Sequence, residues 1–239
     1  MPAAPGDFVI AFDKTDLDAF LRIAPDQVPF AMSFALNKTA QAVKEAEYEG
    51  MKAAFDRPTP YVLRSLQFPP WAWATKRKLE ATIGFKDGAW QYVKPHVIGG
   101  GRSLKRYEHR LFAGRYSSPG RGAKLDKYGN MPGSALTRIM SQLGASSDPN
   151  QNATNSTRSK AKRKASRYFF NADQSAVYER KGKTITPVLV VTRAPAYKPR
   201  LDYHGIALTT YQQRLLPNFG IAWQQAMATS GFKGKWNNR

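Results

Sequence analysis

Apolar residues recur every three or four positions near both ends of the chain, which is the spacing of one face of an α-helix. The first such stretch runs from about Pro29 to Phe55, and Pro29 suits a first helical turn. Its stripe is interrupted by Glu47 and comprises Leu36, Ala40, Val43, Met51 and Phe55. We expect a long helix that ends at the prolines that follow Arg57.

The C-terminal stretch predicts a second long helix. Pro217 lies inside it and is expected to kink it or to begin its second half. Gly231 is expected to end it, and residues 232–239 are predicted to form a loose basic tail. The apolar face of this helix comprises Tyr211, Leu215, Phe219, Ala222 and Ala226.

Two shorter helices are predicted from their capping residues. One follows Asp13 or Thr15 near the N-terminus. The other runs from Ser134, as N-cap, to Leu143, and Gly144 follows it.

Alternating or β-prone stretches predict strands between the helices. Phe8–Phe12 is read as a strand or an extended arm. Leu79–Phe85 and Trp90–Val97 flank the turn signal Asp87-Gly88 and predict a hairpin. Three further strands are predicted at Tyr168–Phe170, Ala176–Arg180 and Thr184–Thr192, the last of which contains Pro187 and is therefore an edge strand or carries a bulge.

Together these elements predict an α+β protein. N-terminal helices come first, then a mostly antiparallel sheet with long loops, and then a C-terminal helix packed on the sheet. The length suits a single domain over residues 1–239.

Residues 145–166 differ from the rest of the chain because they contain almost no apolar side chains. We predict a flexible basic loop inserted in the fold, since such a stretch buries too little to offset its ordering entropy. Two interpretations stay open: non-specific contact with nucleic-acid phosphates, or a solvated loop that aids solubility. No aromatics are interleaved with the charges, so base stacking is not indicated. The candidate nucleic-acid-facing residues are Arg158, Lys160, Lys162, Arg163, Lys164 and Arg167.

The charge balance points to a polyanionic partner. The chain has 37 Lys and Arg against 17 Asp and Glu, a formal charge of +20. Nucleic acid, an anionic membrane and acidic protein surfaces all fit this balance. No apolar run approaches the ~20 residues that span a bilayer, and the N-terminus lacks the pattern of a signal peptide. A soluble protein without a membrane partner is therefore expected.

Residues that would carry chemistry are sparse. The chain has no cysteine, which excludes disulfides and thiolate metal sites. His96, His109 and His204 show no metal-ligand spacing, and Gly99–Gly101 is better read as a hinge than as a phosphate cradle. Asp126 and Asn130 could be read as metal ligands, but Asp126 has no second carboxylate near it in the sequence. A loop in which both bond their own backbone, with Gly129 at a positive φ, is the favoured alternative. No catalytic residue, metal site or cofactor is predicted.

The segment Pro69–Ala74 contains Trp71 and Trp73 between prolines and alanines. Exposed tryptophans there would suit a protein–protein contact. Ordinary core aromatics are the alternative. Trp71 and Trp73 are the candidate interface residues.

Several motifs resemble those of virion proteins of tailed bacteriophages. Four segments resemble a group of phage virion proteins: Phe34–Ala40, Phe55–Pro60, Val97–Glu108 and Leu125–Asn130. The two ends are similar to the minor tail protein Z, or tail-completion, family of siphophages, in which an Ala-rich helix with a central Asn opens the chain. Its closing segment is matched by Leu208–Tyr211 and Leu216–Ala222, whereas residues 58–132 depart from the family.

The resemblance implies a non-enzymatic structural component of a phage tail or head–tail neck. It implies a homo-oligomeric ring or plug around the DNA channel, sixfold or twelvefold, with other tail or neck proteins as partners and non-specific contact with phage DNA. The expected location is the virion, after assembly in the host cytoplasm. The alternatives are a metal-dependent nuclease that uses Asp126 and a non-specific DNA-binding protein.

Overall fold

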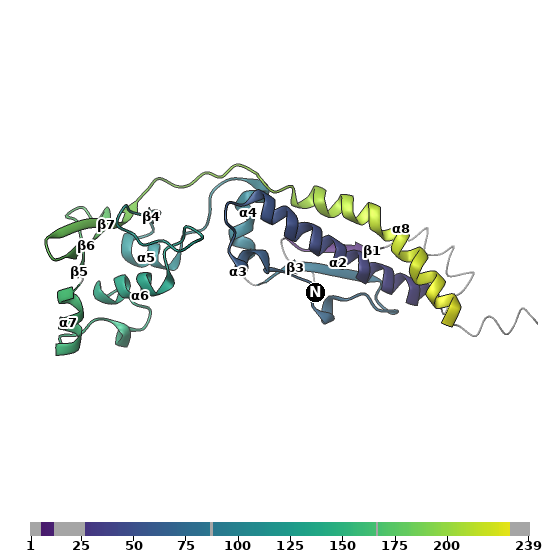
Figure 1. The fold of residues 1–239 in the computed structure, drawn as a ribbon, viewed down its shortest axis with the longest axis horizontal. Coiled ribbons are helices and arrows are strands. Elements are labelled where there is room, and N and C mark those ends of the chain that lie inside the picture. Colours follow the sequence, from purple (N-terminus) through teal and green to yellow (C-terminus); the bar gives the residue numbers. More distant parts are fainter. Residues whose placement is uncertain (1–5, 12–26, 87, 166, 230–239) are drawn as a thin grey trace, which may run out of the picture. The chain divides into compact units, whose positions relative to one another are not determined.

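The computed structural model describes residues 6–11, 27–86, 88–165 and 167–229. The short helix expected after Asp13 or Thr15 and the tail 232–239 lie outside these residues. The chain is an α+β protein with antiparallel sheets and a long C-terminal helix packed on a sheet, which confirms the expected class (Figure 1).

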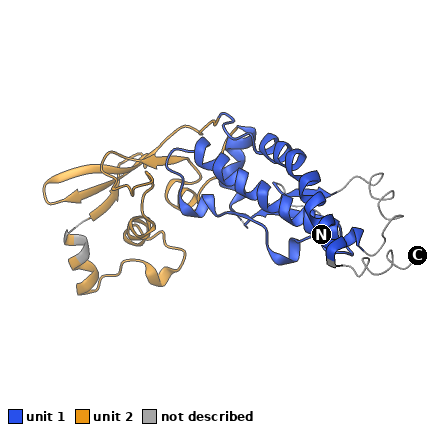
Figure 2. Cartoon of the chain, turned by 45° about the vertical axis from the view of Figure 1, so that its right-hand side comes forward, with its two compact units in different colours: residues 1–99, 198–239 blue, residues 100–197 orange. Residues whose placement is uncertain are grey.

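The chain forms two compact units, where the sequence led us to expect one domain over 1–239 (Figure 2). Unit 1 comprises residues 1–99 and 198–239, and unit 2 comprises residues 100–197. The apolar side chains divide in the same way, because the core cluster formed by α5, α6 and the strands of unit 2 contains no residue of unit 1. Each unit therefore buries a core of its own.

Two antiparallel helices of 27 residues form the frame of unit 1: α2 (Val28–Ala54) and α8 (Tyr203–Thr229). Both agree with the predicted helices, and Pro217 lies within a continuous α8. Small residues on the facing surfaces, such as Ala31, Ala35 and Ala222, are fully buried and allow close approach. At the other end of the pair, a Cβ on Gly50 would lie 2.6 Å from Ile206.

A three-stranded antiparallel sheet completes unit 1, in the order β1 (Phe8–Ala11), β3 (Glu80–Phe85), β2 (Leu66–Gln67). The short elements α3 (Pro60–Leu63) and η1 (Pro70–Ala72) flank β2. The sheet shares a core with both long helices, and Phe8 of β1 stacks on the buried Tyr203 of α8 at 4.3 Å between ring centroids.

The predicted hairpin is wrong in its second half, because Trp90–Ile98 forms the helix α4. Strand β3 already has β1 and β2 on its two edges, so the sheet offers no free edge beside it for Trp90–Val97. Trp90, Val93 and Val97 also fit helical spacing and pack towards the core.

Unit 2 contains a four-stranded antiparallel sheet in the order β4-β7-β6-β5. The three predicted strands are confirmed as β5 (Arg167–Phe170), β6 (Ala176–Lys181) and β7 (Thr184–Val191), and β4 is Ser117–Pro119. The register shifts so that Tyr178 faces Pro187 while Val177 faces Leu189, which confirms a bulge next to Pro187. Helices α5 (Arg106–Phe112) and α6 (Gly133–Gln142) cover one face of this sheet (Figure 1).

Residues 145–166, for which we predicted a flexible basic loop, contain short helices. They contain the 3₁₀ helix η2 (Pro149–Gln151) and the helix α7 (Thr157–Ala165). The capping signals explain the difference: Asp148 accepts a bond from the amide of Asn150, and Ser156 Oγ accepts one from the amide of Ser159. The segment is also tied to α6, since Ser141 Oγ donates to the carbonyl of Gln151 at 2.5 Å.

Candidate nucleic-acid interface

The positive charge of the chain is concentrated in unit 2. Residues 100–197 contain 19 of the 37 Lys and Arg but only 5 of the 17 Asp and Glu, which gives this unit +14 of the formal +20. At least 14 of its basic side chains therefore have no acidic partner of their own within the unit. Such an excess repels itself unless an anion neutralises it.

The five acidic residues of unit 2 have structural partners. Asp148 caps η2, Asp173 accepts bonds from the Ser175 amide and hydroxyl in the β5–β6 turn, and the 7%-exposed Glu179 accepts one from Tyr168 Oη at 3.0 Å. The remaining two are Glu108, which pairs with Arg102, and Asp126, which accepts bonds from its own loop. Glu179 also pairs with Lys181 at 3.0 Å. Apart from that pair, these carboxylates organise turns and core.

Helix α7 carries five of the six basic residues that we singled out, and Arg167 lies at the start of β5. Arg158, Lys160, Lys164 and Arg167 are exposed. Lys160 and Lys164 are four residues apart, a spacing at which like charges destabilise a helix. Phosphates bound along α7 would remove this repulsion.

The carboxylate of Glu108 is the internal anchor of unit 2. It is fully buried, and its two oxygens accept bonds from Arg102 Nη2 at 2.6 Å and Nη1 at 2.7 Å. The amides of Lys105 and Ser117 donate to it at 2.7 and 2.8 Å. Burial alone would raise the pKa of Glu108, but these bonds and the charge of Arg102 outweigh it and lower the pKa to about 2.

Arg102 is consequently not available for the phosphate cradle that we weighed at Gly99–Gly101. Its guanidinium also lies over the ring of Tyr116, at 5.0 Å from the centroid. Gly99 and Gly100 have φ values of 77° and 90°, which suit glycine, and the boundary between the two units falls between them. This agrees with the hinge interpretation.

Asp126 forms the self-bonded loop that we favoured over a metal site. Its Oδ1 accepts bonds from the amides of Tyr128 and Asn130, both at 2.9 Å, and Gly129 has a φ of 78°. Among the described residues, no three His, Asp or Glu side chains lie together where they would hold a metal ion. This geometry therefore gives the nuclease alternative no supporting observation.

The histidines lie apart in the fold. His96, at the end of α4, packs edge-on against Phe55 at 4.9 Å, and burial together with the charge of Arg200 lowers its pKa. His204 lies edge-on to Phe8 at 5.6 Å, and His109 is exposed on α5. No element brings two of them together in a site.

The two candidate interface tryptophans lie beside β2 in unit 1. Trp71, in η1, is 83% exposed, and Trp73 is 47% exposed. Trp73 Nε1 donates to the carbonyl of Phe68 at 3.3 Å, while Asn37 of α2 holds the neighbouring Ala74 through two hydrogen bonds of 3.0 and 2.7 Å. Trp71 is thus presented to solvent on an anchored segment, which excludes the core alternative for this residue.

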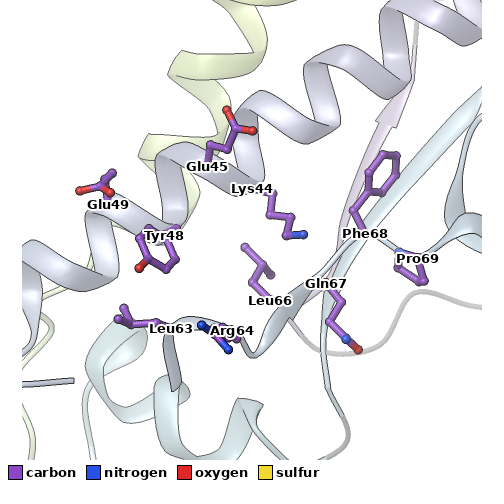
Figure 3. Close-up of a pocket in the computed structure, with 10 residues that line it drawn as sticks. All are labelled: Lys44, Glu45, Tyr48, Glu49, Leu63, Arg64, Leu66, Gln67, Phe68 and Pro69. Atoms are coloured by element: carbon purple, nitrogen blue, oxygen red, sulfur yellow. The ribbon is translucent and has the colours of Figure 1, made fainter. Parts of the chain in front are cut away.

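A groove of about 400 Å³ lies between α2 and the chain around β2 (Figure 3). The side chains along it have opposite charges, with Glu45 and Glu49 on one wall and Lys44 and Arg64 nearby. Its lining contains no histidine and no serine or threonine. The groove therefore offers no serine, threonine or histidine side chain for a hydroxyl–imidazole pair.

Comparison with known proteins gives no match to a protein-family model, a curated protein or a solved structure. Within the described part of the chain, no helix has the length and apolar content required to cross a bilayer. The basic surface of unit 2 is the feature that the structure adds to the sequence pattern, and it was visible in the sequence only as the run 158–167.

Proposed function

We propose that the chain is a non-enzymatic structural protein of a phage tail or head–tail neck, and that residues 100–197 contact the DNA. The observation that best supports the DNA contact is the excess of 14 positive charges in unit 2. DNA offers a dense row of phosphates, and a surface rich in Lys and Arg binds them without reading sequence.

The assembly part of the proposal has two supports. One is the resemblance of the chain ends to tail-completion proteins. The other is Trp71, because an 83%-exposed tryptophan on an anchored segment is typical of a residue buried by a partner. We propose that copies of the chain form a ring or plug around the DNA channel, sixfold or twelvefold, in the virion, together with other tail or neck proteins.

Replacing the basic residues of α7 by Gln is expected to weaken binding of the full-length chain to duplex DNA by at least tenfold at moderate salt. The slope of log K against log salt is expected to become shallower by about 0.9 for each lost phosphate contact. Fluorescence anisotropy with a labelled duplex over a salt series measures both quantities. The residues to replace are Arg158, Lys160, Lys162, Arg163 and Lys164.

The matched control removes the same number of charges from exposed positions of unit 1. It is expected to change the salt slope by less than half as much, because these side chains lie outside the proposed interface. Equal slopes for the two variants would contradict a DNA contact through α7. The control positions are Lys38, Lys52, Arg64, Arg77 and Lys94.

Trp71→Ser is expected to weaken self-association by at least tenfold, since a central interface tryptophan contributes about 2 kcal/mol or more. Sedimentation velocity over a concentration series measures the effect, with the wild type expected to form closed hexamers or dodecamers. Leu216→Ser is the control, because Leu216 is 69% exposed on α8 and outside the Trp segment. A wild-type chain that stays monomeric at every concentration would contradict the ring.

A further inference from the structure

The sheet of unit 2 has a second face that α5 and α6 do not cover. On the covered face, Tyr168, Val177 and Leu189 belong to the buried core. Side chains alternate between the faces along a strand, so their neighbours in sequence point the other way. This second face, formed by Arg167 and Phe169 of β5 and by Tyr178 and Arg180 of β6, is called the outer face below.

The pairing of β5 with β6 arranges these four residues as two cross-strand pairs, one aromatic and one basic. Phe169 faces Tyr178, and Arg167 faces Arg180. The Phe169 and Tyr178 rings stack at 5.9 Å with an interplanar angle of 22°, and the Arg180 guanidinium lies 5.6 Å from the centre of the Phe169 ring. Both arginines are exposed, and both rings are half-buried.

The outer face has no negative charge of its own. Glu179 is the sole acidic residue in the four strands, and it lies on the covered face, where it accepts the bond from Tyr168. Like charges directly opposite each other on neighbouring strands destabilise a sheet. The Arg167–Arg180 pair therefore has an energetic cost that a bound anion would remove.

We infer that the outer face binds a single-stranded nucleic acid, with phosphates on Arg167 and Arg180 and unpaired bases on Phe169 and Tyr178. An aromatic pair beside cations is the arrangement that takes up a flexible strand, because every base has a flat π-face to stack. A duplex engages only the arginines, since its bases are already stacked on one another. The aromatic pair of Phe169 and Tyr178 distinguishes this site from the basic surface of α7.

This inference goes beyond non-specific contact with duplex DNA, and it differs from our expectation for the basic run, where base stacking is not indicated. The run 158–167 contains no aromatic residue, but the strand that follows it does, and pairing with β6 brings a second ring alongside. The proposed contacts are to phosphates and bases and not to the sugar, so DNA and RNA strands are both expected to bind.

The test measures the affinity of the full-length chain for labelled oligo(dT), oligo(U) and a duplex of equal phosphate number. Phe169→Leu/Tyr178→Leu is expected to weaken binding of both single strands by about tenfold or more, and to leave duplex binding within about twofold. Arg167→Gln/Arg180→Gln is expected to weaken all three. The matched control, Arg106→Gln/Arg138→Gln, makes the same charge change on α5 and α6. It is expected to leave the ratio of single-strand affinity to duplex affinity as in the wild type.

A second measurement uses the wild-type chain, so that it does not depend on the folding of any variant. Photo-crosslinking with oligonucleotides that carry 5-iodouracil is expected to label the peptide that contains Phe169 or Tyr178. Crosslinks that avoid both residues overturn the inference, as does a folded leucine variant that binds single strands like the wild type. Unchanged duplex binding in the α7 variant would contradict the proposed function and not this inference, so the two failures are distinguishable.

Discussion

Glu108→Gln is expected to lower the free energy of unfolding of unit 2 by about 3–5 kcal/mol, the largest effect expected of any single substitution in this unit. The side chain is fully buried, and Arg102, which pairs with it, is 17% exposed. The substitution removes the charge while keeping the shape, so the guanidinium stays largely buried without a counter-ion.

The pH dependence of this loss follows from the lowered pKa of Glu108. Because the pKa falls from 4.5 to about 2 on folding, the carboxylate contributes stability that is fully present above about pH 4.5 and is lost as the pH falls towards 2. The shift corresponds to about 3 kcal/mol. The difference between the wild type and Glu108→Gln is therefore expected to be large at pH 7 and small near pH 2.

The chain allows this measurement to be made on unit 2 alone. All five tryptophans lie outside residues 100–197, so tryptophan fluorescence reports on unit 1, whereas far-UV circular dichroism reports on both units. In urea, Glu108→Gln is expected to shift the dichroism transition and leave the fluorescence transition in place. Glu80→Gln, which removes an exposed partner of Lys78, is the control and is expected to cost less than about 1 kcal/mol. Equal effects of the two substitutions would contradict the buried pair.

Glu47→Met is expected to stabilise unit 1 by several kcal/mol at pH 8 and to change little at pH 4. Glu47 is fully buried on α2, and neither carboxylate oxygen has a hydrogen-bond partner among the described residues. Burial, with a further contribution from the charge of Asp202, raises its pKa from 4.5 to about 8. The folded state therefore holds a proton that the unfolded state releases.

The proton held by the folded state determines whether stability rises or falls with pH. The wild type is expected to lose stability as the pH rises from about 4.5 to 8, by up to about 5 kcal/mol, and to lose no more above 8. Met has a similar volume and no charge, so the variant is expected to show a flat profile in fluorescence-detected urea unfolding. Glu45→Met, at an exposed position of the same helix, is expected to keep the wild-type slope. A wild-type profile without this slope would show that Glu47 is not held in its neutral form.

The parts of the fold that depend on local pattern were predictable. The stripe of α2 indicated both the helix and the anomaly at Glu47, and the periodicity of α8 indicated its buried face, of which Leu215, Phe219 and Ala222 are the centre. The bulge near Pro187 followed equally from residue type.

The parts that depend on long-range pairing were not predictable. The segment 90–98 forms a helix because β3 is paired on both edges, and this is decided by residues 8–11 and 66–67. The division into two units depends on which apolar residues meet in space. The glycines at 99–101 indicated a hinge, but local pattern did not show that two separate cores lie on either side of it. For the same reason the basic run was visible in the sequence, but the stacked pair of Phe169 and Tyr178 was not, since the two residues lie on different strands.

The central claim is that unit 2, and not unit 1, lies against nucleic acid. Lysine labelling of the full-length chain, with and without saturating DNA and quantified by mass spectrometry, tests it directly, because both units carry exposed lysines. We predict that DNA protects Lys160, Lys164 and Lys183 and leaves Lys38, Lys52 and Lys94 as reactive as in the free chain. Protection that is equal in the two units, or confined to the second group, would contradict the account.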